Sequence, residues 1–172
     1  MKILKFKQFS KYFLAASFQF AAVILLSYSC SKTSDDIKPK ISLLSFSKDT
    51  LKQGDLNQDS VFISFRFEDG DGDLGWGSSD LRRDIFVMDD RTNLIMDQFK
   101  IPDSPSSNGK PITGQLTIRV YTTCCIFPNQ IPPCTTPPQY PFDSLTLDIY
   151  LKDRAGTESN HIKTPRIILR CE

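Results

Sequence analysis

Strict alternation of apolar and polar residues marks the middle of the chain and favours β-strands over helices. In residues 61–67, Val61 and Ile63 begin a series of apolar residues at every second position. Residues 116–121 and 145–151 repeat this pattern. A period of two puts alternate side chains on one face of an extended chain, whereas a helix requires a period of 3.6. The pattern therefore predicts strands that bury one face.

Four weaker segments bring the expected number of strands to about seven: residues 41–47, 84–89, 94–100 and 165–171. Connections rich in Gly, Pro and Asp separate them, and no window of helical length carries an amphipathic stripe. We therefore expect an all-β domain, an antiparallel β-sandwich of immunoglobulin-like type. A closed barrel is the alternative arrangement.

The first 29 residues differ in composition from the rest of the chain. They contain four Lys and no acidic residue, and residues 12–28 are almost wholly apolar. A basic start followed by an apolar stretch is typical of a secretory signal peptide. The stretch ends at Ser29-Cys30, which resembles the lipobox of bacterial lipoproteins, in which the cysteine is diacylated. We expect residues 1–29 to be a signal peptide and Cys30 to carry the lipid, with an uncleaved anchor helix as the alternative.

The residues that follow Cys30 are polar and lack periodicity. We interpret residues 30–40 as a flexible, lipid-anchored tether and residues 41–172 as the β domain. Asp35 and Asp36 resemble the surface-export signal of Bacteroidota lipoproteins, or they serve only as solvated linker charges. The expected location is the cell outer membrane, either facing the periplasm or exposed on the surface.

Charge and apolar content limit the classes of protein to which the chain can belong. The chain has 21 Lys and Arg against 20 Asp and Glu, and the part after the basic export segment is slightly acidic. This excludes a strongly basic nucleic-acid binder. Hydrophobic residues make up 40% of the chain, which excludes disorder through a lack of apolar residues. The single long apolar segment excludes a polytopic membrane protein.

The order of the expected strands predicts which loops share an end of the domain. If successive strands run in opposite directions, the loops at 68–83, 101–113 and 153–163 return to the end where the tether enters. The connections at 48–59 and 122–143 then lie at the opposite end, together with the C-terminus. Residues far apart in the sequence are thereby expected to meet.

An acidic, glycine-rich loop at residues 68–77 is the most unusual stretch of the chain. Carboxylates at alternate positions supply the oxygen ligands that Ca²⁺ prefers, and glycine permits the tight curvature that brings them together. The spacing follows an EF-hand loop at four places, but Leu74 stands where that loop needs Gly and strands flank it. We therefore expect a looser calcium loop, to which the 153–163 loop contributes Asp153 or Glu158. The candidate metal ligands are Asp69, Asp71, Asp73, Asp80 and Asp153.

Two other interpretations of the acidic loop stay open. Asp and Gly also form solvated turns in which the side chains accept hydrogen bonds from nearby amides, and Arg82, Arg83 and Arg154 are available to neutralise the carboxylates. Closely spaced carboxylates also carry out general acid–base chemistry. On that interpretation the chain is a small extracytoplasmic hydrolase that uses the carboxylates of the loop.

Two short motifs carry a resemblance to a known group of proteins. The first runs from Phe65 to Gly75 and contains the acidic loop, and the second runs from Ile149 to Gly156 and ends in Asp-Arg-Ala-Gly. Together they resemble small Bacteroidota envelope lipoproteins with an immunoglobulin-like domain, in which such a turn closes the last hairpin. The resemblance covers most of residues 41–171. It implies a fold and a location, and no activity.

Four cysteines remain once Cys30 is assigned to lipid. An even number in an exported chain favours disulfides, and the spacing does not favour a zinc site. Joining the adjacent Cys124 and Cys125 would close a strained ring, so two pairings stay plausible. Cys124 continues the inward series of the strand before it, and Cys171 continues the inward series of the last strand. We therefore predict the disulfides Cys124–Cys171 and Cys125–Cys134.

Six of the eleven prolines lie in the loop at residues 122–143. Proline favours stiff, extended backbone that loses little entropy on binding, and aromatic residues are interspersed with the prolines. We predict a contact surface there for a glycan or protein ligand, formed by Phe127, Tyr140 and Phe142. The alternative is a pinned loop whose aromatic rings pack on the end of the sandwich.

Motifs that carry catalysis are not evident in the sequence. The sole histidine, His161, is expected to be an exposed turn residue, and no serine lies in a nucleophile-elbow motif. There is no phosphate-binding glycine loop that ends in lysine and no dinucleotide fingerprint. We therefore expect a non-catalytic binding or structural module that is attached to the membrane by lipid, possesses no cofactor apart from Ca²⁺, and binds no nucleic acid.

Overall fold

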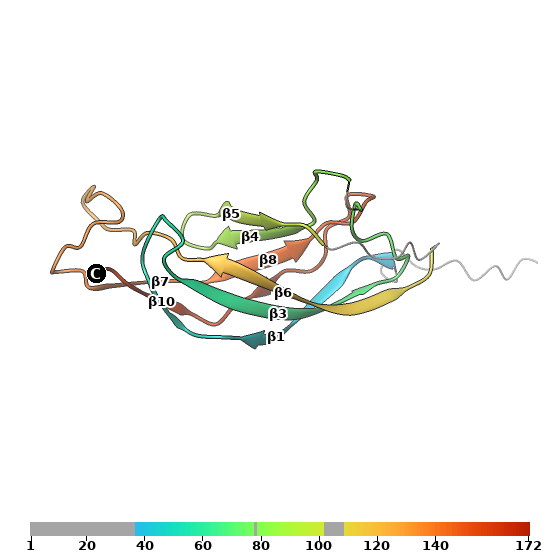
Figure 1. Ribbon diagram of the computed structural model, residues 1–172, viewed down its shortest axis with the longest axis horizontal. Coiled ribbons are helices and arrows are strands. Elements are labelled where there is room, and N and C mark those ends of the chain that lie inside the picture. Colours follow the sequence, from blue (N-terminus) through green and yellow to red (C-terminus); the bar gives the residue numbers. More distant parts are fainter. Residues whose placement is uncertain (1–36, 78, 102–108) are drawn as a thin grey trace, which may run out of the picture. The chain divides into compact units, whose positions relative to one another are not determined.

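The computed structural model describes residues 37–77, 79–101 and 109–172, and its regular elements are strands (Figure 1). The described residues belong to one compact unit. Among the described residues, no helix is long and apolar enough to cross a membrane. In chain order the strands are β1 (Lys40–Phe46), β2 (Thr50–Lys52), β3 (Ser60–Asp69), β4 (Ile85–Asp89), β5 (Leu94–Phe99), β6 (Ile112–Tyr121), β7 (Phe142–Leu145), β8 (Leu147–Leu151), β9 (Ile162–Lys163) and β10 (Ile167–Arg170).

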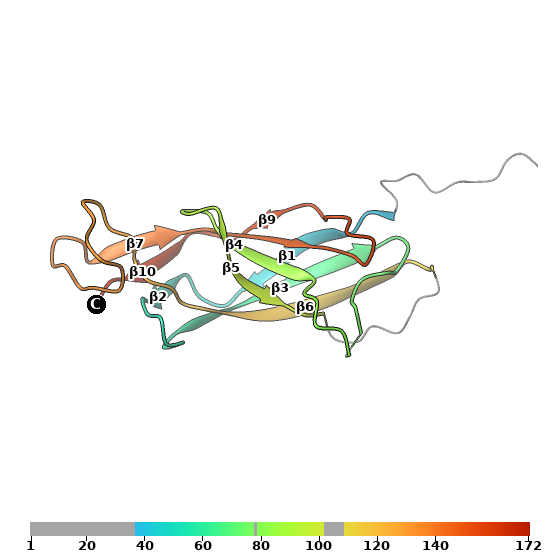
Figure 2. The ribbon, with the colours of Figure 1, turned by 90° about the horizontal axis from the view of Figure 1, so that it is seen from above.

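The strands form three sheets, and the all-β expectation is confirmed. One sheet has the order β1-β3-β6, a second has the order β5-β4-β8-β9, and a third has the order β2-β10-β7. Figures 1 and 2 show β1, β3 and β6 side by side, with β4, β5 and β8 forming another layer. Buried residues of all three sheets belong to one hydrophobic cluster, so the sheets enclose a common core.

The alternation seen in the sequence produces this core. On β3, Val61, Ile63 and Phe65 are fully buried, whereas Phe62 between them remains 46% exposed. Ile118 and Val120 on β6 are buried opposite them, in register with Ile63 and Val61. Burying a large apolar side chain stabilises the fold by about 1.5–3 kcal/mol. A slip of one residue would expose the whole set, so the pattern fixes the register.

The structure also contains strands and pairings that differ from the expected set. The short strands β2 and β9 were not among the expected segments, because two or three residues are too few to show a periodicity. The expected strand at 145–151 is divided at Thr146 into the end of β7 and all of β8. β2 pairs with β10 in parallel, while the other strand pairs that the structure describes are antiparallel.

The loops expected at the tether end do meet there. Asp69 at the end of β3 lies opposite Ile112 at the start of β6. The backbone N–H of Arg154, in the 153–163 loop, donates to the carbonyl of Asp73 in the acidic loop, at 3.3 Å. The Asn160 side chain both accepts from the N–H and donates to the carbonyl of Ile41, near the start of β1. We call this the acidic end.

The opposite end joins the remaining connections through Gln53, which is buried. The Gln53 amide donates to the carbonyl of Thr135, and its oxygen accepts from the backbone N–H of Cys125. The N–H of Cys171 donates to the carbonyl of Pro141. The connections at 48–59 and 122–143 and the C-terminus therefore lie together, as expected. We call this the disulfide end.

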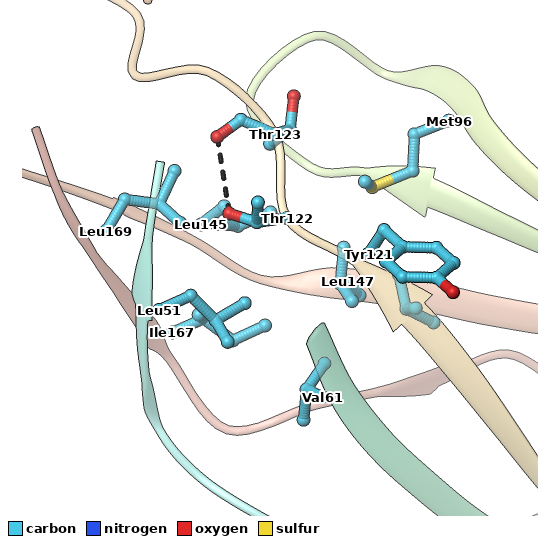
Figure 3. A pocket seen from close by; sticks show the side chains of 11 residues that line it. Leu51, Val61, Met96, Tyr121, Thr122, Thr123, Leu145, Leu147, Ile167 and Leu169 are labelled. Carbon is cyan, nitrogen blue, oxygen red and sulfur yellow. Dashed lines mark hydrogen bonds between the residues drawn. The ribbon is translucent and has the colours of Figure 1, made fainter. Parts of the chain in front are cut away.

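The core contains a small cavity between the sheets, whose lining residues are shown in Figure 3. Its volume is about 10 Å³, at the lower limit of what a single water molecule requires. Its walls are mainly aliphatic, including Leu51, Val61 and Leu147. A space of this size and polarity is a packing defect and does not serve as a ligand site.

Candidate functional site

The acidic loop turns back on itself directly after β3. Three of its glycines, Gly72, Gly75 and Gly77, have φ values of 70°, 83° and 78°. This left-handed region is costly for residues with a Cβ atom, so glycine allows the tight path of the loop. The turn brings the side chains that follow β3 back towards Asp69, the last residue of the strand.

Three carboxylates converge inside this turn. Asp69, Asp71 and Asp73 each contribute one oxygen to a group in which the atoms lie within 4.8 Å of one another. Asp69 is only 2% exposed, and the other two residues are partly buried. The sequence therefore predicted correctly that alternate Asp residues in this loop would be gathered. Oxygen ligands at this spacing are suited to a hard cation.

The two oxygens of Asp69 and of Asp73 have different surroundings. Oδ2 of Asp69 accepts from the N–H of Leu74 at 3.1 Å, and Oδ2 of Asp73 accepts from the N–H of Ala155 at 3.2 Å. Oδ1 of each residue is buried and receives no hydrogen bond from the described part of the chain. Each of these two carboxylates is thus held through one oxygen, while the other has no donor there.

The electrostatic environment of the group disfavours negative charge. Burial, followed by repulsion from Asp71 and Asp73, raises the pKa of Asp69 to about 6, although the hydrogen bond from Leu74 opposes the shift. Burial, followed by the charges of Asp153 and Asp71, raises the pKa of Asp73. Repulsion among like charges and desolvation both act in this direction. A bound cation would counter both effects.

Two of the five candidate ligands are not members of this group. Both carboxylate oxygens of Asp80 accept hydrogen bonds from Arg82, which lower the pKa of Asp80 to about 2. Asp153 is buried close enough to affect Asp73, but its Oδ1 accepts from the N–H of Thr157 at 2.7 Å and so caps its own turn. The structure thus gathers Asp69, Asp71 and Asp73, leaves Asp153 beside them, and turns Asp80 towards Arg82.

Two contacts at the acidic end were not predicted from the sequence. Asp84 is completely buried just before β4, where its Oδ2 accepts from the N–H of Ile101 at 2.9 Å. Arg154 donates from its side chain to the carbonyl of Gly75, and so ties the 153–163 loop to the acidic loop. Asp84 lies outside any motif, and Arg154 was expected only to neutralise carboxylates. Neither contact could be predicted, because both depend on how the loops meet.

The predicted disulfide pairing is wrong, since the structure joins Cys124 to Cys134 and Cys125 to Cys171. The prediction extended the alternation of β6 to Cys124, but β6 ends at Tyr121. Beyond that point the backbone is no longer held in a ladder, and Cys125 becomes the fully buried residue. Its N–H donates to Gln53, which brings its side chain towards Cys171 in the core. The inward position predicted for Cys171 is confirmed.

The aromatic residues of the proline-rich loop differ in exposure. Phe127 is partly buried against the core, and its ring centroid lies 6.1 Å from that of Tyr140. Phe142 is 62% exposed at the start of β7. Ile126, which was not among the candidate contact residues, is 47% exposed in the same loop. Phe142 and Ile126 are thus the large apolar side chains that this loop presents to solvent.

His161 is exposed, as expected, and it is held between two carboxylates. Nδ1 lies 2.8 Å from Asp148 Oδ1, and Nε2 lies 2.9 Å from Glu158 Oε1. The ring stacks on Tyr150 at a centroid distance of 4.7 Å. The hydrogen bond to Glu158 raises the pKa of His161, burial opposes this shift, and the hydrogen bond to Asp148 raises the pKa further. With both nitrogens occupied, the ring serves to link β8 to the turn before β9.

The outer face of the β1-β3-β6 sheet carries a shallow polar hollow that sequence reasoning missed. It is lined by Arg66 and Glu68 of β3 and by Thr113, Gly114 and Gln115 of β6. Four of these positions alternate with the core residues, so the sequence marks them only as outward-facing, and Gly114 lies between two of them. The hollow is open to solvent and brings no group of catalytic residues together.

Comparisons of the chain with protein-family models, with curated proteins and with solved structures find no match. Function is therefore inferred from the side chains of this chain. Cys30 and residues 1–36 lie outside the described residues, as do Ser78 and residues 102–108. The expected signal peptide, the lipid anchor and most of the tether thus stay predictions.

Proposed function

We propose that the chain is a lipid-anchored protein of the cell outer membrane, of the kind found in Bacteroidota, and that its domain is a non-catalytic binding or structural module. Cys30 carries the lipid, and the tether attaches the domain at the acidic end. The disulfide end then points away from the attachment and offers its surface to a protein or glycan ligand. The two disulfides are the observation that carries this proposal.

The strand order supports an immunoglobulin-like sandwich. If β1, β3 and β6 are strands A, B and E, then β4, β5 and β8 are strands C, C′ and F, and β9 begins strand G. The observed orders β1-β3-β6 and β5-β4-β8-β9 then correspond to the two sheets of such a fold, A-B-E and C′-C-F-G. In this fold β2 and β10 are short segments that extend the sandwich towards the disulfide end.

The disulfides support an extracytoplasmic location. Disulfides persist in oxidising compartments and are rare in the cytoplasm. Cys125 and Cys171 are both buried and lie 6.0 Å apart at Cα, so their bond forms part of the core. The basic and apolar segment at residues 1–29 points to the same destination, since it has the composition of an export signal.

The surface of the disulfide end supports a role in contact with a ligand. Disulfide Cys124–Cys134 pins a proline-rich loop, so this loop loses little conformational freedom on binding. Exposed apolar side chains on such a frame, here Ile126 and Phe142, are typical of contact surfaces. The loop is also far along the domain from the tether.

The hydrolase alternative has one observation in its favour, because a carboxyl with a pKa of about 6 resembles a general acid. It is the weaker proposal, since Asp69 is 2% exposed and a substrate would have little access to it. The causes of the raised pKa, burial and neighbouring negative charge, are also those expected of a cation site.

Metabolic labelling with an alkyne analogue of palmitate tests the anchor. We expect the full chain to be labelled and recovered in the outer-membrane fraction, and the Cys30→Ala variant to lose both the label and the membrane attachment. Cys134→Ala is the matched control, since it removes a cysteine that is assigned to a disulfide. Label that persists in Cys30→Ala would contradict the proposal.

Co-sedimentation of the soluble domain, residues 31–172, with outer-envelope material tests the contact surface. We expect Ile126→Ser and Phe142→Ser together to weaken binding about tenfold, since buried apolar contacts dominate such surfaces. The matched control is Leu81→Ser, which changes a side chain that is 89% exposed at the acidic end. Equal loss of binding in the control would contradict a surface at the disulfide end.

A further inference from the structure

We propose that Asp69, Asp71 and Asp73 bind one Ca²⁺ ion at the acidic end of the domain. One oxygen of each carboxylate lies within 4.8 Å of the others, a spacing that a single ion can span with bonds of about 2.3–2.6 Å. This inference is independent of the lipid anchor and of the ligand proposed above.

The burial of Asp69 is a second observation that points to a ligand. Its side chain is 2% exposed, and Oδ1 receives no hydrogen bond from any described residue. Buried polar atoms normally have partners, and a buried anionic oxygen without one is costly. The Asp69 carboxylate belongs to the converging group, so a cation bound there would supply a partner for its negative charge.

The hydrogen bonds of the loop have the arrangement that metal ligands show. Backbone N–H groups of Leu74 and Ala155 bind Oδ2 of Asp69 and of Asp73, and leave Oδ1 of each buried without a described donor. Carboxylates that bind metals are commonly oriented in this way by hydrogen bonds to their second oxygen. The backbone thus fixes the carboxylate planes before any ion binds.

The positive charge of Arg154 offsets only part of the effect on Asp73, whose pKa stays raised by burial and by the charges of Asp153 and Asp71. The side chain of Arg154 contacts the loop by donating to the carbonyl of Gly75. Neither Asp69 nor Asp73 forms a salt bridge with a described residue. Asp153 adds further negative charge beside Asp73. Positive charge from solution is therefore favoured at this point.

The donor set selects Ca²⁺ among common cations. The three ligands are carboxylates, which suit hard cations, whereas zinc prefers nitrogen and sulfur. Mg²⁺ demands a nearly ideal octahedron and gives up its water reluctantly, while Ca²⁺ accepts irregular loops. Three protein carboxylates completed by water resemble the weaker extracellular sites, so we expect a dissociation constant of about 10⁻⁴–10⁻³ M.

Binding would also strengthen the contact between the two loops of the acidic end. Asp73 accepts from Ala155 through its side chain and from Arg154 through its carbonyl, so a metal that holds Asp73 also holds the 153–163 loop. Occupancy at about ten times the dissociation constant is expected to raise the melting temperature by about 3–5 °C.

Terbium luminescence and thermal unfolding of the soluble domain test the site. Tb³⁺ replaces Ca²⁺ at oxygen sites, and Trp76, the sole tryptophan, lies three residues after Asp73 and serves as sensitiser. We expect sensitised emission that Ca²⁺ displaces, and an affinity at least tenfold weaker in Asp71→Asn. Because Asp71 is partly exposed, this variant is expected to fold. The isosteric variant Asp69→Asn provides a second test and is also expected to bind Tb³⁺ and Ca²⁺ more weakly.

The matched control is Asp80→Asn, which removes the same charge from the same segment. Its carboxylate is bound by Arg82, so we expect the Ca²⁺ response to be unchanged. The proposal is overturned if Mg²⁺ or an equal ionic strength of NaCl raises the melting temperature as much as Ca²⁺ does. It is also overturned if Asp71→Asn responds to Ca²⁺ like the unaltered domain.

Discussion

The two ends of the domain deal with buried carboxylates in opposite ways. At the disulfide end, Arg91 bridges Asp89 and Asp143, and all three side chains are largely buried. Arg91 also reaches the carbonyl of Cys124, so one guanidinium links the β4-β5 turn, β7 and the pinned loop. At the acidic end, Asp69 is buried and Asp73 is partly buried, and neither forms a salt bridge with a described residue.

This difference shows how a chain of near-neutral composition can still carry a local charge imbalance. At the disulfide end, the chain supplies its own cation, Arg91, and two disulfides. Where it gathers carboxylates without a cation, the missing charge has to come from solution, or the carboxyl groups have to bind protons. The buried carboxylates of the disulfide end are therefore neutralised by the chain, whereas those of the acidic end require cations or protons from solution.

Removal of the disulfide Cys125–Cys171 is expected to have the largest effect. The chain between these cysteines spans 46 positions, and closing it in the unfolded state is worth about 4 kcal/mol, against about 3 kcal/mol for the 10 positions between Cys124 and Cys134. Urea unfolding of the two double-serine variants measures the difference. A greater loss from the Cys124–Cys134 variant would contradict this ranking, as would peptide mapping that recovers Cys124 linked to Cys171.

Replacement of Arg91 by Leu tests the salt bridges that Arg91 forms with Asp89 and Asp143. Two carboxylates would stay buried without their partner, so we expect a loss of about 3 kcal/mol in the free energy of unfolding. Arg82→Leu is the control at the acidic end, because Arg82 pairs with Asp80 on the surface, where a salt bridge contributes little. If both variants lose the same stability in urea unfolding, burial does not distinguish the two ends.

Alternation in the sequence was sufficient to predict the strands but not the contacts beyond them. On β3 and β6 the buried apolar residues were identified, because a ladder keeps the period of two over its whole length. The same argument failed at Cys124, three residues after β6 ends, where Gln53 determines which residue turns inward. Such long-range side-chain contacts have no local pattern in a sequence.

Prediction of the candidate metal site from the sequence was likewise correct within the loop and failed for side-chain contacts beyond it. The Asp residues at alternate positions that follow β3 were gathered as predicted, since glycines in a short loop leave few other paths. The EF-hand spacing suggested Asp80 as well, but a neighbouring Arg82 binds it more readily than a group across the loop. The topology predicted that Asp153 would lie near the acidic loop, and this position is correct. Its side chain, however, accepts a hydrogen bond from Thr157 within its own turn.

Replacement of Asp69 by Asn tests the contrast between the ends, because the change in the free energy of unfolding is expected to differ in sign with and without Ca²⁺. Without metal, removal of a buried charge that lacks a partner is expected to stabilise the domain by about 1–2 kcal/mol, despite the loss of a charged acceptor for Leu74. In about 10 mM Ca²⁺ the variant should be less stable than the unaltered domain, because it has lost one ligand of the ion. Urea unfolding with chelator and with Ca²⁺ measures both states. A variant that is less stable in chelator would show that the carboxylate is satisfied without metal.

His161 offers the smallest and most local test, since here the acidic end does neutralise carboxylates with a residue of its own. Asp148 and Glu158 flank the ring, Tyr150 stacks on it, and Lys152 also pairs with Glu158. The hydrogen bonds to Glu158 and Asp148 raise the pKa of His161 above its unfolded value. Its contribution to stability is therefore complete below about pH 6.5 and is lost as the pH rises through the folded pKa. Because the ring is exposed, we expect less than about 1 kcal/mol.

Proton NMR resolves this titration without ambiguity, because the chain contains a single histidine. Glu158→Gln removes the larger of the two favourable interactions and should lower the pKa of His161 more than Asp148→Asn does. The chemical shift of the ring protons followed against pH gives both values, and the unfolded domain in urea supplies the reference. If the folded and unfolded domains titrate together, the charge of His161 does not stabilise the acidic end.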